Sequence, residues 1–158
     1  MDGASNLTGQ TRPQFYRFHQ GEKTLPFADA EYEARLAKLR TTMAEQGLDA
    51  CVFTSMHNSA YYSGFLYCAF GRQYAQVATA TDSVTISAGI DAAQPWRRGY
   101  GDNITYTDWR KDNFYHAIQT LTGGAKRVGI EFDECGNDFI QLAGLFSLVV
   151  CTTAAKVF

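Results

Sequence analysis

The chain has 158 residues, a length typical of a single domain, with 46% hydrophobic residues and a formal net charge of -2. The composition argues against a nucleic-acid-binding protein, because the chain has no run of Lys and Arg and no RNA-binding motif. It also argues against a membrane protein, because no apolar run is long enough to span a bilayer. No early apolar run resembles a signal peptide.

The four cysteines, at positions 51, 68, 135 and 151, include no CxxC pair. Cys51, Cys135 and Cys151 lie in or beside apolar runs, which is typical of buried free thiols in a reduced compartment. The three histidines stand singly, so no metal-ligand cluster is visible. We therefore expect a cytoplasmic protein with no metal and no cofactor.

In chain order, residues 1–25 are polar and irregular, and we predict an arm that lies over a partner. The globular domain is predicted to occupy residues 26–158. It begins with a helix over Asp29–Gln46, with Asp29 as its cap and Gly47 as its end. The apolar residues of this helix recur at helical spacing: Tyr32, Leu36, Leu39 and Met43.

Short apolar runs bounded by turn-forming residues then predict strands at 48–55, 73–80, 83–89, 103–109, 127–132 and 147–151. The second and third strands form a hairpin around Thr81-Asp82, and Pro95 breaks the stretch that follows them. Further helices are predicted at 57–65 (or a turn), 112–121 and 137–145. Strands that alternate with helices, together with a hairpin, indicate an α/β fold with a mixed β-sheet flanked by helices. No strand is followed by a glycine-rich phosphate loop.

Four residues are candidates for a general acid or base: His57, His116, Glu131 and Asp133. The favoured interpretation of Glu131 and Asp133, in the run GIEFDE, is a solvated strand end. His57 is interpreted as a capping or packing residue, with a site-lining role as the alternative, and His116 as a surface helix residue. The sequence therefore predicts no catalytic residue.

Two groups of arginines are candidates for anion binding. Arg97 and Arg98 follow Trp96, and either an Arg stacked on the indole or an anion clamp explains them. Arg72 lies in the run FLYCAFGRQY, and composition alone favours an ordinary surface arginine. The alternative is an anion-binding residue, around which nearby aromatic residues would leave little competing water. A planar guanidinium there can pair bidentately with a carboxylate or a phosphate.

The runs VFTSMHNSAYYSGFLYCAFGRQYAQV, SAGIDAAQPWRRGYGDNITYTDWRKDNFYHAIQ and RVGIEFDE closely resemble the amino-terminal domain of the creatinase family, over about residues 29–134. The resemblance implies a mixed sheet flanked by helices. It also implies a metal-free enzyme that hydrolyses creatine to sarcosine and urea. In that family a homodimer carries its catalytic residues in a carboxy-terminal pita-bread domain, and the amino-terminal domain of the neighbouring subunit closes the site.

The same resemblance implies two substrate-binding residues in the FGR run. Phe70 would form an apolar wall, and Arg72 would bind the carboxylate of creatine. The resemblance stops near Glu134, and no catalytic half is present in the 158 residues. We therefore expect a truncated or fragmentary creatinase-type domain that supports dimerisation and is inactive alone. Its expected partners are creatine and a second subunit that bears the catalytic domain.

Two alternative functions remain open. The chain could be a stand-alone binding or regulatory module that keeps the fold and the anion site. It could also be the amino-terminal domain of a proline-specific metallopeptidase, although the FLYCAFGR run argues against this. A domain taken from a dimeric enzyme should expose an apolar patch, which we expect over the aromatic run from Tyr61 to Tyr74.

Overall fold

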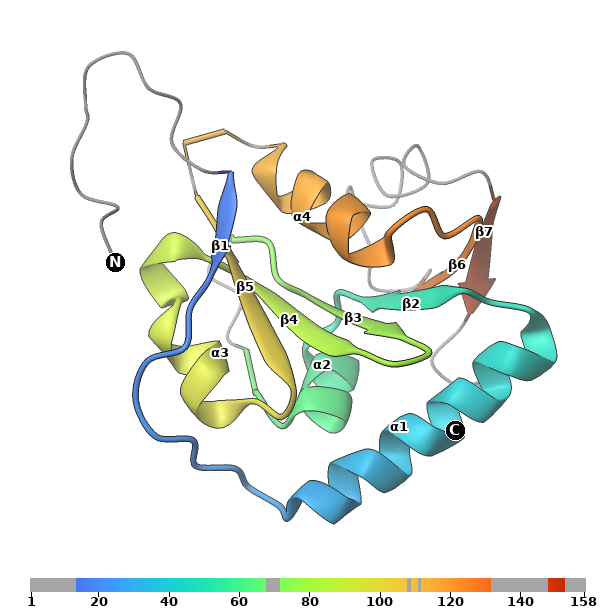
Figure 1. The fold of residues 1–158 in the computed structure, drawn as a ribbon, viewed down its shortest axis with the longest axis horizontal. Coiled ribbons are helices and arrows are strands. Elements are labelled where there is room, and N and C mark those ends of the chain that lie inside the picture. Colours follow the sequence, from blue (N-terminus) through green and yellow to red (C-terminus); the bar gives the residue numbers. More distant parts are fainter. Residues whose placement is uncertain (1–13, 68–71, 108, 111, 132–147, 153–158) are drawn as a thin grey trace.

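A seven-stranded mixed sheet forms the centre of the protein in the computed structural model, which describes residues 14–67, 72–107, 109–110, 112–131 and 148–152 (Figure 1). The strands are β1 (Phe15–Arg17), β2 (Ala50–Phe53), β3 (Ala75–Thr79), β4 (Ser83–Ala88), β5 (Asp102–Tyr106), β6 (Arg127–Glu131) and β7 (Leu148–Thr152). Their order across the sheet is β1-β5-β4-β3-β2-β6-β7. The pairs β2–β6, β6–β7 and β4–β5 are parallel, and the other three pairs are antiparallel. This arrangement confirms the predicted mixed sheet.

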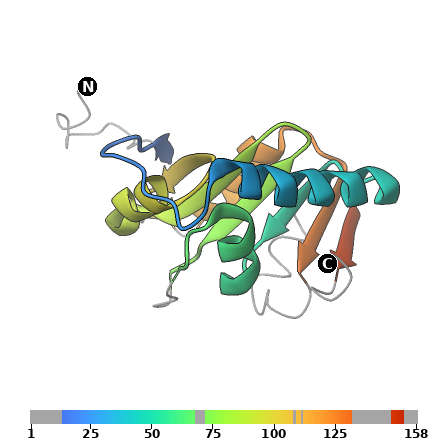
Figure 2. The same cartoon turned by 90° about the horizontal axis from the view of Figure 1, so that it is seen from below.

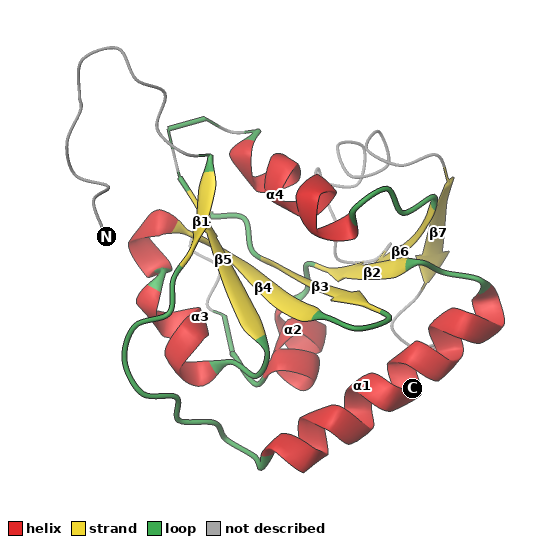
Figure 3. Cartoon of the chain, in the orientation of Figure 1, coloured by secondary structure: helices red, strands yellow, loops and turns green. Residues whose placement is uncertain are grey.

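Helices cover both faces of the sheet (Figures 2 and 3). They are α1 (Asp29–Gln46), α2 (Met56–Ser63), the 3-10 turn η1 (Gly89–Asp91), α3 (Ala93–Arg98) and α4 (Asn113–Thr122). On one face, α4 packs Phe114 and Ile118 against apolar strand residues in the largest core cluster. On the other face, α1 and α2 enclose a second cluster with β2, which includes Leu39, Phe53 and Tyr62. The domain therefore has three layers, helices on each side of the sheet, with a core cluster on each face of the sheet.

Helix α1 has the predicted bounds, and the four residues at helical spacing are all buried. It ends at Gly47, whose φ of 65° is left-handed. The N–H of Gly47 caps the helix, and the N–H of Leu48 donates to the carbonyl of Met43. The cap at the start was predicted wrongly. Ala28 occupies that position without a side-chain bond, and Asp29 is the first helical residue, where its charge suits the helix dipole.

The other predicted strands and helices within the described residues are present, and the prediction for Pro95 is wrong. The hairpin between β3 and β4 turns at the predicted dipeptide, where Thr79 N–H donates to the carbonyl of Asp82 at 2.9 Å. Pro95 does not break the chain there, because it lies in the first turn of α3, where its missing N–H has no helical acceptor. The helix predicted at 137–145 lies outside the described residues.

The segment predicted as an irregular arm contributes a strand to the sheet edge. β1 pairs antiparallel with β5, with Phe15 opposite Tyr106 and Arg17 opposite Ile104. Arg17 and His19 both contact the carboxylate of Asp102. Because of β1, the part of β5 from Ile104 to Tyr106 has a strand neighbour on this side as well as toward β4.

Gly64, the cap that ends α2, provides a test of how the end of α2 packs against Tyr32 of α1. Its φ is 80°, and an added Cβ would overlap the ring and hydroxyl of the buried Tyr32. Gly124 has a similar φ of 86° but open space around it, so it isolates the backbone cost. We expect Gly124→Ala to lower the free energy of unfolding by about 1–2 kcal/mol. Gly64→Ala should lower it by about 1–3 kcal/mol more, because of the overlap. Urea unfolding followed by circular dichroism measures both, and equal losses would contradict this packing.

Candidate functional site

Arg72 lies on the segment between α2 and β3, just before β3 begins, at one end of the sheet. Its side chain is 40% exposed, and its Nη1 lies 3.9 Å from Oδ2 of Asp91 in η1. This exposure agrees with the interpretation of Arg72 as a surface residue, and the structure does not support the alternative in which aromatic residues leave little competing water. The guanidinium faces solvent with one distant carboxylate beside it, so most of its five N–H donors remain available to a ligand.

The backbone of Arg72 is fixed although its side chain is exposed. The hydroxyl of Tyr67 donates to the carbonyl of Arg72 at 2.8 Å, and the hydroxyl of Tyr106 donates to the carbonyl of Gln73 at 3.0 Å. The amide Nε2 of Gln73 donates to the hydroxyl of Tyr115 in α4 at 2.6 Å. Three tyrosines from three parts of the chain thus position this arginine, which limits the entropy lost when a ligand binds.

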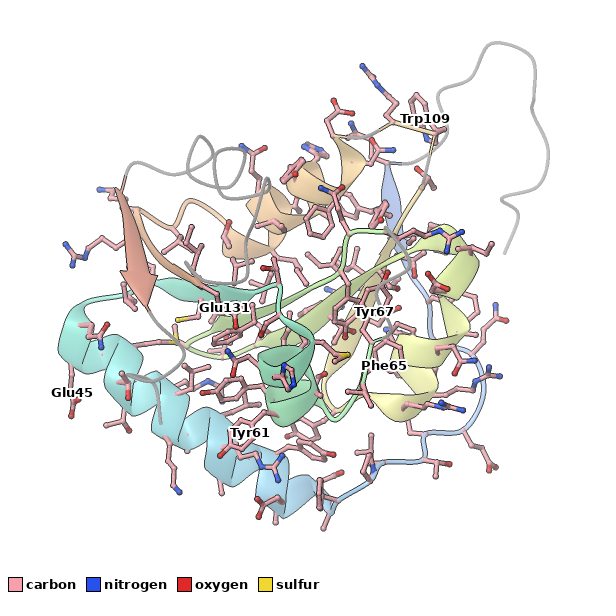
Figure 4. All side chains as sticks on the ribbon, turned by 180° about the vertical axis from the view of Figure 1, so that it is seen from behind. Glu45, Tyr61, Phe65, Tyr67, Trp109 and Glu131 are labelled. Carbon is pink, nitrogen blue, oxygen red and sulfur yellow. The ribbon has the colours of Figure 1, made fainter. Side chains whose placement is uncertain are left out.

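The described aromatic residues nearest Arg72 in the chain are buried, among them Phe65 and Tyr67 (Figure 4). Phe65, Tyr67 and Tyr74 form a cluster of their own, in which the rings of Tyr67 and Tyr74 stack with their centres 4.6 Å apart. Burial raises the pKa of the Tyr74 hydroxyl. The apolar patch expected over the run from Tyr61 to Tyr74 is therefore largely absent from its described residues, and Leu66, 67% exposed, is the exception. Phe70 lies outside the described residues.

Glu131 is the residue that the sequence interpretation placed wrongly. It is not at a solvated strand end but 2% exposed at the end of β6, next to the start of α2 (Figure 4). Its Oε2 accepts from the backbone N–H groups of Thr54 and Ser55 at 2.7 and 2.8 Å. Its Oε1 accepts from the hydroxyl of Ser55 at 2.6 Å and from the amide of Asn58. The carboxylate therefore holds the first turn of α2 against the parallel strands β2 and β6.

The other candidate acids and bases do not converge. His57 is exposed on α2 and His116 is exposed on α4, as predicted for a surface helix residue. Asp133 lies outside the described residues. Within the described part of the chain, no three His, Cys, Asp or Glu side chains form a group that could hold a metal ion.

Cys51 is a buried free thiol, as predicted, and burial raises its pKa to about 12. A thiol with this pKa is protonated at neutral pH and is a poor nucleophile. Nothing about Cys51 therefore suggests catalysis. The side chains of Cys68, Cys135 and Cys151 lie outside the described residues.

The structure disfavours an arginine stacked on Trp96. The indole contacts the ring of His19 at 4.2 Å and carries Nζ of Lys23 at 4.1 Å from its centre. Arg97 and Arg98 instead line a groove beside α3.

No helix among the described residues is both long and apolar enough to cross a membrane.

Taken together, the described residues define an α/β domain that displays a fixed arginine at one end of a mixed sheet. Residues 35–152 match the family model described as the Creatinase/Prolidase N-terminal domain, and the chain belongs to this family.

Relatives of known name fall into two groups. A creatinase from Bacillus sp. (strain B-0618) is 49% identical over 118 residues, which cover 72% of this chain and 29% of that protein. The chain thus spans less than a third of the length of this curated relative. The other group consists of solved structures with the same fold at lower identity.

Two dipeptidase structures serve as examples. The Creatinase/Prolidase N-terminal domain of an X-Pro dipeptidase from Streptococcus pyogenes has a TM-score of 0.67 and 19% identity, and covers 78% of this chain and 95% of that one. The dipeptidase PepE from Mycobacterium ulcerans has a TM-score of 0.69 and 20% identity, and covers 83% of this chain and 36% of that one. Likeness at this identity shows the shared fold alone.

Replacing Glu131 tests its role as the anchor of α2. Glu131→Gln keeps the shape of the side chain but removes the charge and turns one acceptor into a donor. We expect it to lower the free energy of unfolding by about 2–3 kcal/mol, the cost of disrupted bonds to a buried charged group. Glu45→Gln, at an exposed position on α1, is the matched control and should change stability by less than about 0.5 kcal/mol. Equal effects in urea unfolding would rule out the anchoring role.

Proposed function

We propose that this chain is the amino-terminal domain of a creatinase-type hydrolase, which converts creatine and water to sarcosine and urea. The observation that carries the proposal is the 49% identity to a creatinase, against 15–21% for the solved dipeptidase and prolidase structures. In this proposal a carboxy-terminal catalytic domain performs the hydrolysis. The present chain binds part of the substrate and joins the subunits, and it is inactive alone.

Arg72 is proposed to bind the carboxylate of creatine. Creatine carries a guanidinium at one end and a carboxylate at the other, so a permanent cation fixes which end enters the catalytic domain. Three features support this role: the exposed guanidinium, the distant contact with Asp91, and the backbone held by tyrosine hydroxyls. The arginine would orient the substrate without transferring a proton. Phe70 is proposed to form an apolar wall beside it.

The proposed assembly is a homodimer in which this domain closes the site of the neighbouring subunit. An exposed arginine at one end of the sheet suits such a role, because it can reach a ligand held by another chain. The alternatives are a stand-alone binding or regulatory module and the amino-terminal domain of a proline-specific peptidase, and the fold shared with the dipeptidase and prolidase structures is compatible with the latter.

A chimera tests the proposal directly. The chain replaces the homologous amino-terminal segment of the Bacillus creatinase, and urea release from creatine is measured. We expect an active chimera, and no urea release from the chain by itself. Arg72→Ala in the chimera should raise the KM for creatine about 10- to 100-fold, the loss of one charge-assisted contact worth about 1.5–3 kcal/mol. Because the residue transfers no proton, kcat should change less.

Two controls make the result decisive. The amino-terminal domain of the Streptococcus pyogenes dipeptidase, grafted in the same way, has the fold without the close identity and should give no creatine hydrolysis. Arg110→Ala removes an exposed arginine elsewhere and should leave the KM unchanged. An inactive but folded dimeric chimera with this chain would count against the creatinase-type domain. An active chimera with an unchanged KM for Arg72→Ala would reject only the role of Arg72.

A further inference from the structure

A groove of about 480 Å3 lies between three parts of the chain, and neither Arg72 nor Asp91 lines it. Its walls are the linker before α1, the segment that follows α2, and helix α3. The lining residues are Glu22, Thr24, Pro26, Gly64, Phe65, Leu66, Gln94, Arg97 and Arg98. The proposed function does not use this groove.

Backbone contacts tie the walls of the groove together. Thr24 N–H donates to the carbonyl of Arg97 at 2.7 Å, which joins the linker to α3. Tyr100 N–H donates to the carbonyl of Ser63 at 2.6 Å, which joins the end of α3 to the end of α2. Trp96 Nε1 donates to the carbonyl of Gly21 at 3.2 Å. The groove is therefore preformed, so a ligand does not have to order its walls.

The groove carries two arginines whose guanidinium groups have no hydrogen-bond or ion-pair partner among the described residues. Glu22 is the one acidic residue in the lining, so the two positive charges exceed the single negative charge. The aliphatic stem of Arg97 lies against Gly21, whose φ is 86°, and a Cβ there would lie 2.9 Å from Cδ of Arg97. Trp96 engages Lys23 and thus does not occupy either guanidinium.

The groove also has apolar lining residues. Leu66, which is 67% exposed, and Phe65 come from the segment after α2, and Pro26 comes from the linker. An exposed leucine in the same groove as two arginines suits a ligand with an apolar part beside an anionic part. Two neighbouring guanidinium groups favour a fork of anionic oxygens, as in a carboxylate or a phosphate.

We propose that this groove binds a small organic anion, a carboxylate or a phosphate ester that bears an apolar group. Arg97 and Arg98 hold the anionic oxygens, and Leu66 contacts the apolar group. The site is separate from the proposed creatine site at Arg72. Creatine itself is a poor match, because its second end is a cation and would face the arginines or the apolar wall.

Nuclear magnetic resonance titration of the 15N-labelled chain tests the proposal with four probes. Hippurate supplies a carboxylate and phenyl phosphate a phosphate, each beside an aromatic ring. Neutral hippuramide and inorganic phosphate each lack one of the two parts. We expect saturable chemical-shift changes around residues 64–66 and 94–98 with hippurate or phenyl phosphate. Their dissociation constants should be at least tenfold lower than those of hippuramide or inorganic phosphate. The tighter of the two organic anions identifies the acid group.

Variants assign the effect to the groove. The double variant Arg97→Ala/Arg98→Ala should weaken binding of the organic anion at least tenfold. Leu66→Ser should remove most of the difference in affinity between the organic anion and inorganic phosphate. Arg72→Ala should leave the binding unchanged, which separates this site from the proposed creatine site. The thermal unfolding midpoint of each variant checks its fold. Equal binding of hippurate and hippuramide, or unchanged binding in the double variant, would overturn the proposal.

Discussion

The buried carboxylate of Glu131 is the interaction on which the rest of the site depends. It accepts bonds from the backbone and side chains where β2 ends and α2 begins, so it joins helix α2 to the parallel pair β2–β6. A buried carboxylate is stable only when its oxygens are satisfied, and the positive end of the helix dipole adds to the stabilisation. The segment that carries Arg72 follows α2 in the chain, so the same anchor fixes where that segment begins.

The domain combines a fixed backbone with a free charged group. The tyrosine hydroxyls that bond the carbonyls of Arg72 and Gln73 are themselves part of buried aromatic packing. Only the guanidinium reaches solvent, and the carboxylate of Asp91 is too distant to satisfy it. This division suits a binding residue, because the ordering cost is met when the domain folds and not when a ligand arrives.

Shared fold and close identity answer different questions about this protein. The dipeptidase and prolidase domains have the same sheet and helices at 15–21% identity, which shows that the architecture tolerates wide changes in sequence. A fold of this kind hosts different functions, so the architecture does not select between a creatine hydrolase and a peptidase. The proposal of a creatinase-type domain therefore depends on the near relative and on Arg72.

The sequence by itself determined most of the elements, because apolar spacing and glycine ends are local signals. The spacing in α1, the left-handed Gly47 and the hairpin between β3 and β4 were all predicted from neighbouring residues. Local patterns do not decide which of the polar residues between them are buried. Ser87, Asn103 and Thr105 alternate with apolar residues in β4 and β5, as in a strand with one face in water, yet all three are buried.

Only the tertiary structure decided which polar residues became buried and what they hold. Glu131 and the backbone of α2 are more than 70 residues apart in the chain, as are Trp96 and the linker that it bonds. Parallel pairing of β2 with β6 brings Glu131 to α2, and no local pattern encodes that pairing. The sequence could single out Arg72, Arg97 and Arg98 as cations beside aromatic residues, because those neighbours are close in the chain. Their exposure and partners followed from long-range packing, which fixes how much water and which carboxylates each one meets.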